Sequence, residues 1–181
     1  MSGQDLREAW VSLGALVIAR HDFQKTGLSL SAVFPPSMVS EVARGLLNAG
    51  YFLEDLSAMP VKEGLLVTYH YDSFDQPGRV AVRALADSSG TVYSICSVYQ
   101  GAEWHEREAS DFTGVRFIGN TNPVPLLLAA DFPDPPPLLK PEKDLASMSQ
   151  LKLFGDDAEI LDPAWRDIVS PAAPASEEGQ A

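Results

Sequence analysis

Apolar and polar positions alternate along much of the first two thirds of the chain, and turn residues interrupt the alternation at short intervals. The clearest segment, residues 64–71 (GLLVTYHY), is rich in the β-branched and aromatic residues that favour strands. Residues 79–86 place Val80, Val82 and Ala84 on one face of another strand. Because short turns separate such segments, neighbouring strands should pair antiparallel. Further strands are predicted at residues 15–18, 28–34, 51–59, 91–98 and 115–118.

Helical spacing of apolar residues marks two further segments. Residues 37–48 carry Met38, Val42 and Leu46 on one helical face, after Pro-Pro and before an Asn-Ala-Gly sequence typical of a helix end. Residues 102–111 form the second predicted helix, which is dense in charge. The predicted fold class is therefore α+β, with helices packed on one face of a largely antiparallel sheet.

The chain changes character after Gly119. Residues 123–141 are rich in proline, which cannot donate a backbone hydrogen bond and favours extended structure. This segment either lies along a partner or its own domain, or is a stiff linker. Residues 142–181 are polar and acidic and predict a flexible tail, in which residues 161–165 (LDPAW) could dock as an anchor. Residues 1–122 form the predicted α+β domain.

Composition narrows the possible functions of this single-domain chain of 181 residues. Residues 142–181 hold nine acidic and three basic side chains, which is half of the net charge of −12, and this balance disfavours nucleic-acid binding. The one cysteine, Cys96, excludes an internal disulfide, fits a reducing compartment, and cannot ligate an iron–sulfur cluster alone. The first residues do not resemble a signal peptide and no apolar run reaches bilayer length, so we expect membrane association only through a partner.

The charged helix has two interpretations from its residues alone. It is either a solvated, self-paired surface helix or a site built from clustered charges. A metal could use His105, Glu108 and Asp111, although an HExxH zinc motif would need a second histidine at position 109, which is Ala. Cys96 lies among apolar residues, and we therefore expect a buried, inert thiol rather than a nucleophile acting with His105.

The order of residues in this helix resembles a family signature. Residues 102–120 read AEWHEREASDFTGVRFIGN, and the 30 kDa subunit family of respiratory complex I typically shows A-x-W-x-E-R-E-x-x-D, a large apolar residue, G-[IV]-x-F and G-[HN]. Residues 52–56 (FLEDL) also match an upstream strand of that family, and the resemblance covers residues 35–130. It implies an accessory subunit without a redox cofactor of its own, packed against a hydrogenase-like large subunit and next to an iron–sulfur subunit.

Departures from the signature favour one branch of this family. Thr113 stands where a large aliphatic or aromatic residue is usual, Asn120 replaces a histidine, and a proline-rich stretch at residues 131–141 replaces a basic segment. These features are similar to the small subunit of energy-converting, Ech-type membrane-bound [NiFe] hydrogenases, whose [NiFe] and iron–sulfur centres would lie on partner subunits. The alternatives are the 30 kDa subunit of a complex I-type NADH:quinone oxidoreductase and a stand-alone metal-dependent enzyme.

The resemblance also implies where this chain meets its partner. We expect no catalytic, cofactor-binding or metal-binding residue in this chain, and a position on the cytoplasmic side of the cell membrane through the complex. Clustered charges at an interface favour specificity and orientation more than raw affinity. The predicted partner interface consists of Trp104, Glu106, Arg107, Glu108, Asp111, Phe112, Gly114 and Phe117.

Overall fold

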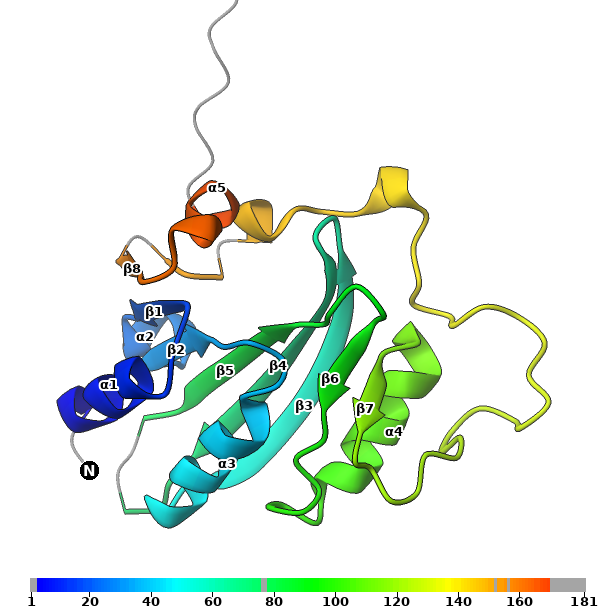
Figure 1. The fold of residues 1–181 in the computed structure, drawn as a ribbon, viewed down its shortest axis with the longest axis horizontal. Helices are drawn as coiled ribbons and strands as arrows, with labels where there is room; N and C mark the ends of the chain where they lie inside the picture. The colour runs from blue at the N-terminus through cyan, green and yellow to red at the C-terminus, as the bar shows by residue number, and fades with distance from the viewer. Residues whose placement is uncertain (1–2, 76–77, 152, 156, 170–181) are drawn as a thin grey trace, which may run out of the picture.

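A mixed sheet of six strands forms the centre of the protein in the computed structural model, which describes residues 3–75, 78–151, 153–155 and 157–169 (Figure 1). The strand order is β3-β4-β5-β2-β1-β8, and every neighbouring pair is antiparallel except β2 and β5, which are parallel. The strands are β1 (Val17–Arg20), β2 (Leu30–Val33), β3 (Phe52–Val61), β4 (Gly64–Asp72), β5 (Val80–Leu85) and β8 (Ala158–Ile160).

Three helices cover what we call the front face of this sheet. They are α1 (Gly3–Ser12), α3 (Val39–Asn48) and α4 (Ala102–Thr113), whose buried residues form the main core with the front-facing residues of β1, β2, β4 and β5. A short helix, α2 (Phe23–Thr26), joins β1 to β2. Two further strands, β6 (Thr91–Tyr93) and β7 (Arg116–Ile118), pair parallel as a separate small sheet beside α4 (Figure 1). The predicted α+β class with helices on one face is confirmed.

Two local predictions are wrong in detail. The strand predicted at residues 91–98 ends at Tyr93, and Cys96 lies in the turn that follows it. The pairing of β2 with β5 is parallel because α3 and the β3–β4 hairpin intervene between them, so that β5 returns to the sheet beside β2 rather than after a short turn. Parallel neighbours require such a long connection.

The C-terminal segment differs from the predicted flexible tail. Residues 158–160 form β8, which pairs with β1, and Leu161 donates its N–H to the carbonyl of Leu16. Met148, Phe154 and Trp165 are buried against the opposite, back face of the sheet, where Trp165 belongs to the LDPAW motif predicted as an anchor. The other elements of the segment are η1 (Glu142–Asp144), η2 (Met148–Leu151), η3 (Pro163–Trp165) and α5 (Arg166–Val169).

The last two predictions concern the C-terminal residues and membrane-spanning helices. Residues 170–181, the last part of the predicted tail, lie outside the described residues. Among the helices that the structure describes, none combines the length and the apolar composition needed to cross a bilayer.

Trp165 provides a test of the packed C-terminal segment. Replacing this side chain, which is 9% exposed, with alanine should lower the free energy of unfolding by roughly 3 kcal/mol, because a large buried ring leaves a cavity. Chemical denaturation of the full chain measures this change. The matched control is Trp104→Ala, because Trp104 is 65% exposed and its loss should cost less than about 0.5 kcal/mol. Equal small effects of both substitutions would show that the segment does not pack on the sheet.

Candidate functional site

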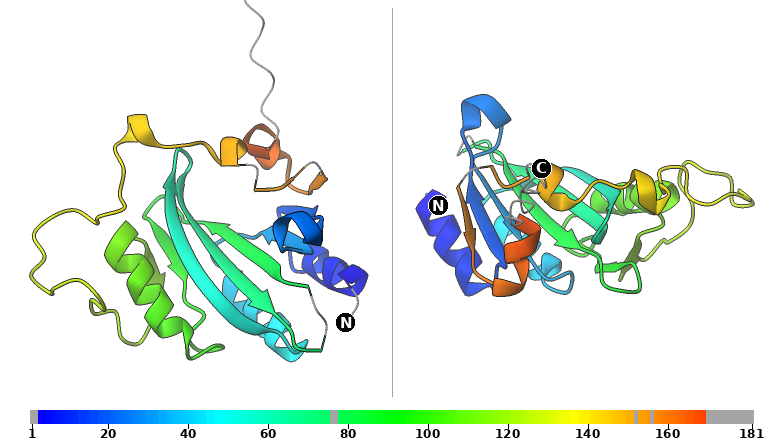
Figure 2. Two further views of the ribbon diagram at one scale, coloured as in Figure 1. Left: turned by 180° about the vertical axis from the view of Figure 1, so that it is seen from behind. Right: turned by 90° about the horizontal axis from the view of Figure 1, so that it is seen from above.

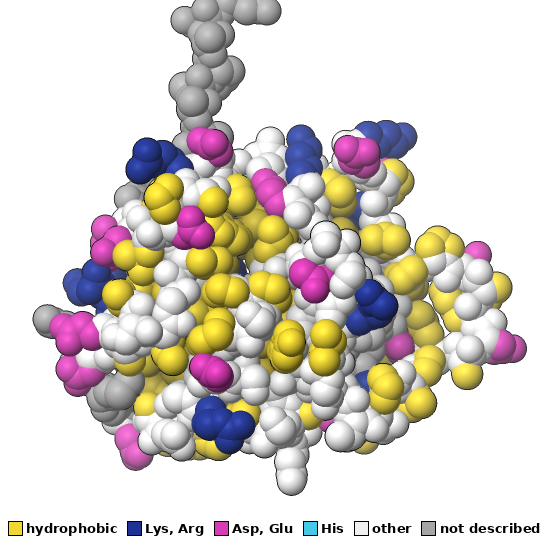
Figure 3. Space-filling model, in the orientation of Figure 1, with side chains coloured by type: hydrophobic (Ala, Val, Ile, Leu, Met, Phe, Trp, Pro, Cys, Tyr) yellow, Lys and Arg dark blue, Asp and Glu magenta, His cyan; other side chains and the backbone are white. Residues whose placement is uncertain are grey.

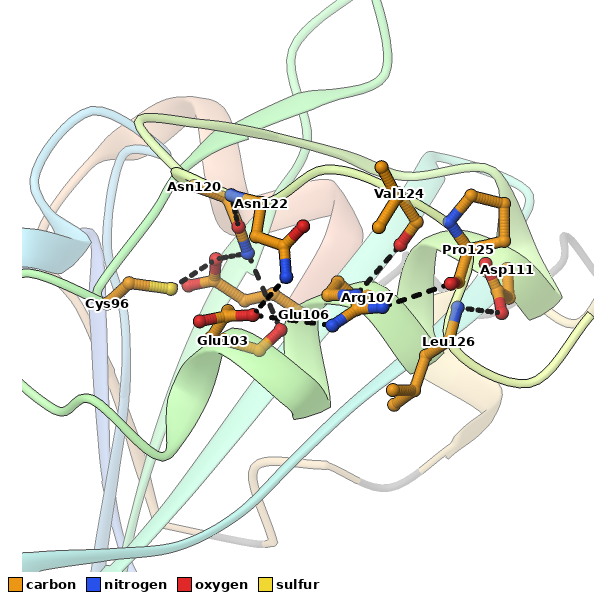
Figure 4. Close-up of polar contacts among 10 residues, drawn as sticks. All are labelled: Cys96, Glu103, Glu106, Arg107, Asp111, Asn120, Asn122, Val124, Pro125 and Leu126. Carbon is orange, nitrogen blue, oxygen red and sulfur yellow. Dashed lines mark hydrogen bonds and ion pairs between the residues drawn. The ribbon is translucent and has the colours of Figure 1, made fainter. Parts of the chain in front are cut away.

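Helix α4 carries the predicted site, and one of its carboxylates is completely buried. Glu106 is 0% exposed, and its side chain points away from solvent toward the loops that follow β6 and β7 (Figure 4). An ionised carboxylate at such a position is costly unless hydrogen bonds replace its lost hydration. The local structure supplies these bonds from two directions.

Four donors satisfy the Glu106 carboxylate. Its Oε1 accepts the backbone N–H of Ile95 at 2.8 Å, and its Oε2 accepts the hydroxyl of Ser94 at 2.8 Å. The same Oε2 also accepts the side-chain amide of Asn120 at 2.9 Å and the thiol of Cys96 at 3.1 Å. Glu106 therefore joins α4 to the turn after β6 and to the chain after β7, and it holds both segments against the helix.

The surroundings of the Cys96 thiol disfavour its thiolate form. Burial raises its pKa to about 12, and the hydrogen bond to Glu106 and the charge of that carboxylate act in the same direction, while a hydrogen bond with Ser94 opposes them. A thiol becomes a nucleophile only as the thiolate. The side chain is half-buried rather than fully buried, and the prediction of an inert thiol agrees with this environment.

Arg107, one position further along α4, binds backbone rather than a partner's carboxylate. Its Nε donates to the carbonyl of Val124 at 2.8 Å and its Nη2 to the carbonyl of Pro125 at 3.0 Å (Figure 4). Its Nη1 pairs with Glu103 at 3.3 Å, and the Oε1 atom of Glu103 also accepts the side-chain amide of Asn122 at 2.7 Å. The planar guanidinium thus holds two successive carbonyls, which a lysine could not do with the same geometry.

Asp111, one turn after Arg107, holds the next three residues of the same segment. Its Oδ2 accepts the backbone N–H groups of Leu126, Leu127 and Leu128 at 3.0, 2.8 and 3.0 Å. Burial acts to raise the pKa of Asp111, but the three N–H groups and the charge of Arg107 outweigh it and lower the pKa below its ordinary value. Hydrogen bonds to the charged form of a carboxylate have this effect.

These contacts organise the proline-rich segment, which we call the strap (residues 123–141). The strap leaves the body after residue 122, is tied along α4, projects outward and returns to the end of the helix (Figures 1 and 2). On its return, Leu138 donates its N–H to the carbonyl of Phe112 at 2.8 Å. A Cβ at Gly114, whose φ is +78°, would lie 3.2 Å from Pro136, so a side chain there would be strained and would crowd the strap. The stiff-linker alternative does not describe this anchored segment.

The strap presents apolar side chains outward while its backbone is held inward. Figure 3 shows hydrophobic side chains along the part of the molecule that projects to the right. A cavity of about 370 Å³ lies between residues 123–125 and the side formed by α4 and β7, and it is lined in part by Arg107 and Phe117. Exposed apolar side chains occur along the strap at Val124 (52%), Leu127 (60%), Leu138 (52%) and Leu139 (48%).

The eight predicted interface residues divide into two groups. Glu106, Arg107 and Asp111 turn their side chains to other parts of this chain, and Phe117 is buried beneath them at 8% exposure. The other four residues face solvent or the strap; they are Trp104, Glu108, Phe112 and Gly114. The hydrogen bonds described for Glu106, Arg107 and Asp111 are therefore made within this chain, and the partner interface stays a prediction.

The predicted metal-binding residues do not come together. His105 faces Asp55 on β3, with Nδ1 3.5 Å from the carboxylate, while Asp111 is committed to backbone N–H groups. Within the described parts of the chain, no group of three or more His, Cys, Asp or Glu side chains could hold a metal ion.

Sequence reasoning missed the residues that complete the network. Asn120 binds Glu106, Asn122 binds Glu103, and Ser94 binds Glu106 from the other side. Asn120 stands where a histidine is usual in the family, which is a weak signal that its side chain has a specific contact. Nothing in the local sequence around Ser94 indicates that it faces a buried carboxylate.

Comparison with protein families and sequences finds one matching family and several related subunits. The sequence model of the respiratory-chain NADH dehydrogenase, 30 Kd subunit, matches residues 32–144, which is more than half of the chain. An NADH-quinone oxidoreductase subunit of Xanthobacter autotrophicus is 44% identical over 54 residues, which cover 30% of this chain and 26% of the relative. NAD(P)H-quinone oxidoreductase subunit J of Prochlorococcus marinus is 28% identical over 117 residues, which cover 59% of this chain and 67% of the relative. The chain thus matches only about a quarter of the first relative's length.

Two solved structures share the fold. A trypsin-resistant fragment of Nqo5, residues 1–134, superposes with a TM-score of 0.54 at 20% identity and covers 66% of this chain and 97% of the fragment. A chain of the membrane-bound sulfane sulfur reductase, an archaeal respiratory membrane complex, superposes with a TM-score of 0.59 at 21% identity and covers 83% of this chain and 89% of that chain. At these identities the likeness concerns the fold alone.

Asp111 is predicted to control the order of the strap. In Asp111→Ala, three backbone N–H groups lose a charged acceptor, and local opening should become at least about tenfold more frequent. Limited thermolysin digestion, with cleavage mapped to residues 123–141, measures this opening. Glu108→Ala is the matched control, because Glu108 is exposed on the same helix. Equal cleavage rates in the two variants would contradict the role of Asp111.

Cys96 gives a second test, of the Glu106 network. At pH 8 its alkylation by iodoacetamide in the native chain should be at least about a hundredfold slower than in urea, because little thiolate is present when the pKa is about 12. Glu106→Gln should accelerate the native reaction, since it removes the negative charge beside the thiol. Glu108→Gln should leave the rate unchanged. A native rate equal to the rate in urea would exclude the described environment.

Proposed function

Because the chain belongs to the family of the respiratory-chain NADH dehydrogenase 30 Kd subunit, we propose that it is a non-catalytic docking subunit of a membrane-associated, complex I-type oxidoreductase. The chain would contribute no redox centre and would hold a catalytic partner in position. The curated relatives are named as subunits of quinone oxidoreductases, which supports this proposal.

The anchored strap is the observation that carries the docking role. A segment rich in proline and leucine is held in one shape by Arg107 and Asp111, while its apolar side chains remain exposed. Such an exposed apolar surface on a rigid support is typical of protein interaction sites. Because the strap is already ordered, a partner would bind it without a large cost of ordering.

The residues of α4 would then have two distinct roles. Trp104 and Glu108 face outward and would contact the partner directly, together with the strap leucines. Glu106, Arg107 and Asp111 would act as positioning residues, because their side chains determine where the strap runs. Large aromatic side chains such as Trp104 commonly contribute most to an interface.

The proposed partners are a hydrogenase-like or complex I-type large subunit and a neighbouring iron–sulfur subunit. This chain would reach the cytoplasmic face of the cell membrane only through them. The finer proposal is an energy-converting [NiFe] hydrogenase, in which the metal centres belong to the partner subunits. Its support comes from the differences from the residues usual in the family, namely Thr113, Asn120 and the proline-rich strap. In this chain the Thr113 hydroxyl bonds to its own helix, and Asn120 completes the Glu106 network.

An affinity pull-down of the tagged chain from gently solubilised membranes tests both levels of the proposal. Recovery of a nickel-containing large subunit with membrane subunits would support the hydrogenase-type complex. A large subunit without nickel, together with NADH-oxidising partners, would assign the chain to complex I itself. Recovery of this chain alone would overturn the docking role.

Two strap leucines are predicted to contribute directly to partner binding. The double substitution Leu127→Asp and Leu139→Asp places charge on an apolar contact and should reduce recovery of the large subunit at least about tenfold, since burying an unpaired carboxylate is costly. The matched control is Leu47→Asp on α3, because Leu47 is 45% exposed and lies outside the strap. Denaturation curves of all variants should coincide with that of the unmodified chain. Unchanged recovery with the double variant would remove the strap from the interface.

Arg107 provides a different test, of positioning rather than contact. Arg107→Ala should release the large subunit, because the strap loses the contacts that hold its carbonyls of Val124 and Pro125. The same variant should show increased cleavage of the strap in the absence of any partner. Loss of the partner with a fully protected strap would instead indicate direct contact by Arg107.

A further inference from the structure

The back face of the sheet contains a buried cation, Arg83, which forms no ion pair with the described residues. Arg83 lies in the middle of β5, between Thr68 of β4 and Val33 of β2, and is 5% exposed. Arg83 lies on the face of β5 opposite Val80, Val82 and Ala84, and the C-terminal segment covers it. Phe154 of that segment lies with its ring centre 5.9 Å from the guanidinium carbon.

Two of the three guanidinium nitrogens of Arg83 have no acceptor. Neither Nε nor Nη1 has a hydrogen-bond partner among the described residues, although both are buried. Arg79, the other arginine of this strand region, also has an Nε without a partner, but its Nη2 pairs with Glu54 at 2.5 Å. Burial lowers the pKa of Arg83 to about 10, so the side chain is still charged at neutral pH. Leaving a buried charge unpaired in this way is strongly unfavourable.

The polar groups around Arg83 do not neutralise its charge. Ser31 and His70 flank Ala81, the residue two positions before Arg83 on the same face, and the Ser31 hydroxyl lies 2.7 Å from Nε2 of His21. Burial lowers the pKa of both histidines, and the charge of Arg83 lowers it further. Asp55 and Glu54 of β3 act on the pKa of His70 in the opposite direction, and the Arg79 charge opposes them.

The histidines beside Arg83 are less buried than its guanidinium. His21 and His70 are half-buried, so the rim of the site meets solvent while the guanidinium does not. Figure 2, left, shows the back of β3, β4 and β5 without a helix over it in the described part of the chain, and the C-terminal segment lies along one end.

We propose that Arg83 anchors a carboxylate-binding site on the back face, with His21 and His70 at its rim. The fork of N–H donors in a guanidinium matches the two oxygens of a carboxylate, and such charge-assisted pairs are stronger than neutral hydrogen bonds. The carboxylate belongs either to a free small acid or to an Asp or Glu side chain of a partner subunit. This site is separate from the strap and does not depend on the docking role.

Titration of the full-length chain with sodium formate tests the site, with sodium chloride holding the ionic strength constant. Formate should raise the melting temperature saturably, by about 5 °C or more at a hundredfold excess over its dissociation constant. In a ¹⁵N-labelled sample it should also shift one arginine Nε–H signal. Both responses should be absent in Arg83→Met, which removes the charge and keeps a long apolar stem.

Two further variants make the result specific. Arg79→Met should respond to formate as the unmodified chain does, because Arg79 already pairs with Glu54. Arg83→Lys keeps the charge without the fork and should bind formate at least about tenfold more weakly. Absence of a saturable response in the unmodified chain, or an equal response in Arg83→Met, would overturn the proposal.

The pull-down from membranes separates the two sources of the carboxylate. If a partner supplies it, Arg83→Met should reduce recovery of that partner while the strap stays protected from thermolysin. If the ligand is a free acid, Arg83→Met should lose only the response to formate. Failure of the strap variants to affect recovery would concern the docking role and leave this result unchanged.

Discussion

The buried carboxylate of Glu106 is the constraint on which the arrangement around α4 depends. A charge at 0% exposure needs donors on several sides, and they come from the turn after β6 and from Asn120 beyond β7. These two segments are far from each other along the chain and meet at one helical side chain. The contact with Asn120 also positions the chain just before it leaves the body to form the strap. A buried group therefore determines where the exposed segment starts.

The strap shows how a segment without regular structure acquires a defined shape. Its prolines remove backbone donors and prevent a strand or helix from forming. The helix compensates with side chains: Arg107 binds two carbonyls, and Asp111 binds three consecutive N–H groups. Charges that a surface helix would normally expose to water are thereby used to satisfy backbone groups. The apolar side chains of the strap are left free for contact outside this chain.

The sequence was sufficient to predict most of the strands, though not β8, as well as the two longer helices after residue 34, the fold class and the family, because each depends on local periodicity or on a contiguous motif. The parallel pairing of β2 with β5 depends on contacts between distant segments and has no local signal. Glu106 lies in a run of charges that resembles a solvated face, so its burial could not be inferred from spacing. Trp165 was the one residue of the acidic C-terminal region with a sequence signal for docking, and it is buried.

The buried charges on the two sides of the sheet differ in their hydrogen-bond partners. On the front side, Glu106 has donors for both of its oxygens, and the ion is part of the folded chain. On the back face, Arg83 is almost as inaccessible, yet two of its donors point to no acceptor in the described residues, and its neighbours His21 and His70 carry no negative charge. An apolar residue of similar length would fill this position at lower cost. The arginine is therefore better explained by a group that it binds than by the stability of the fold.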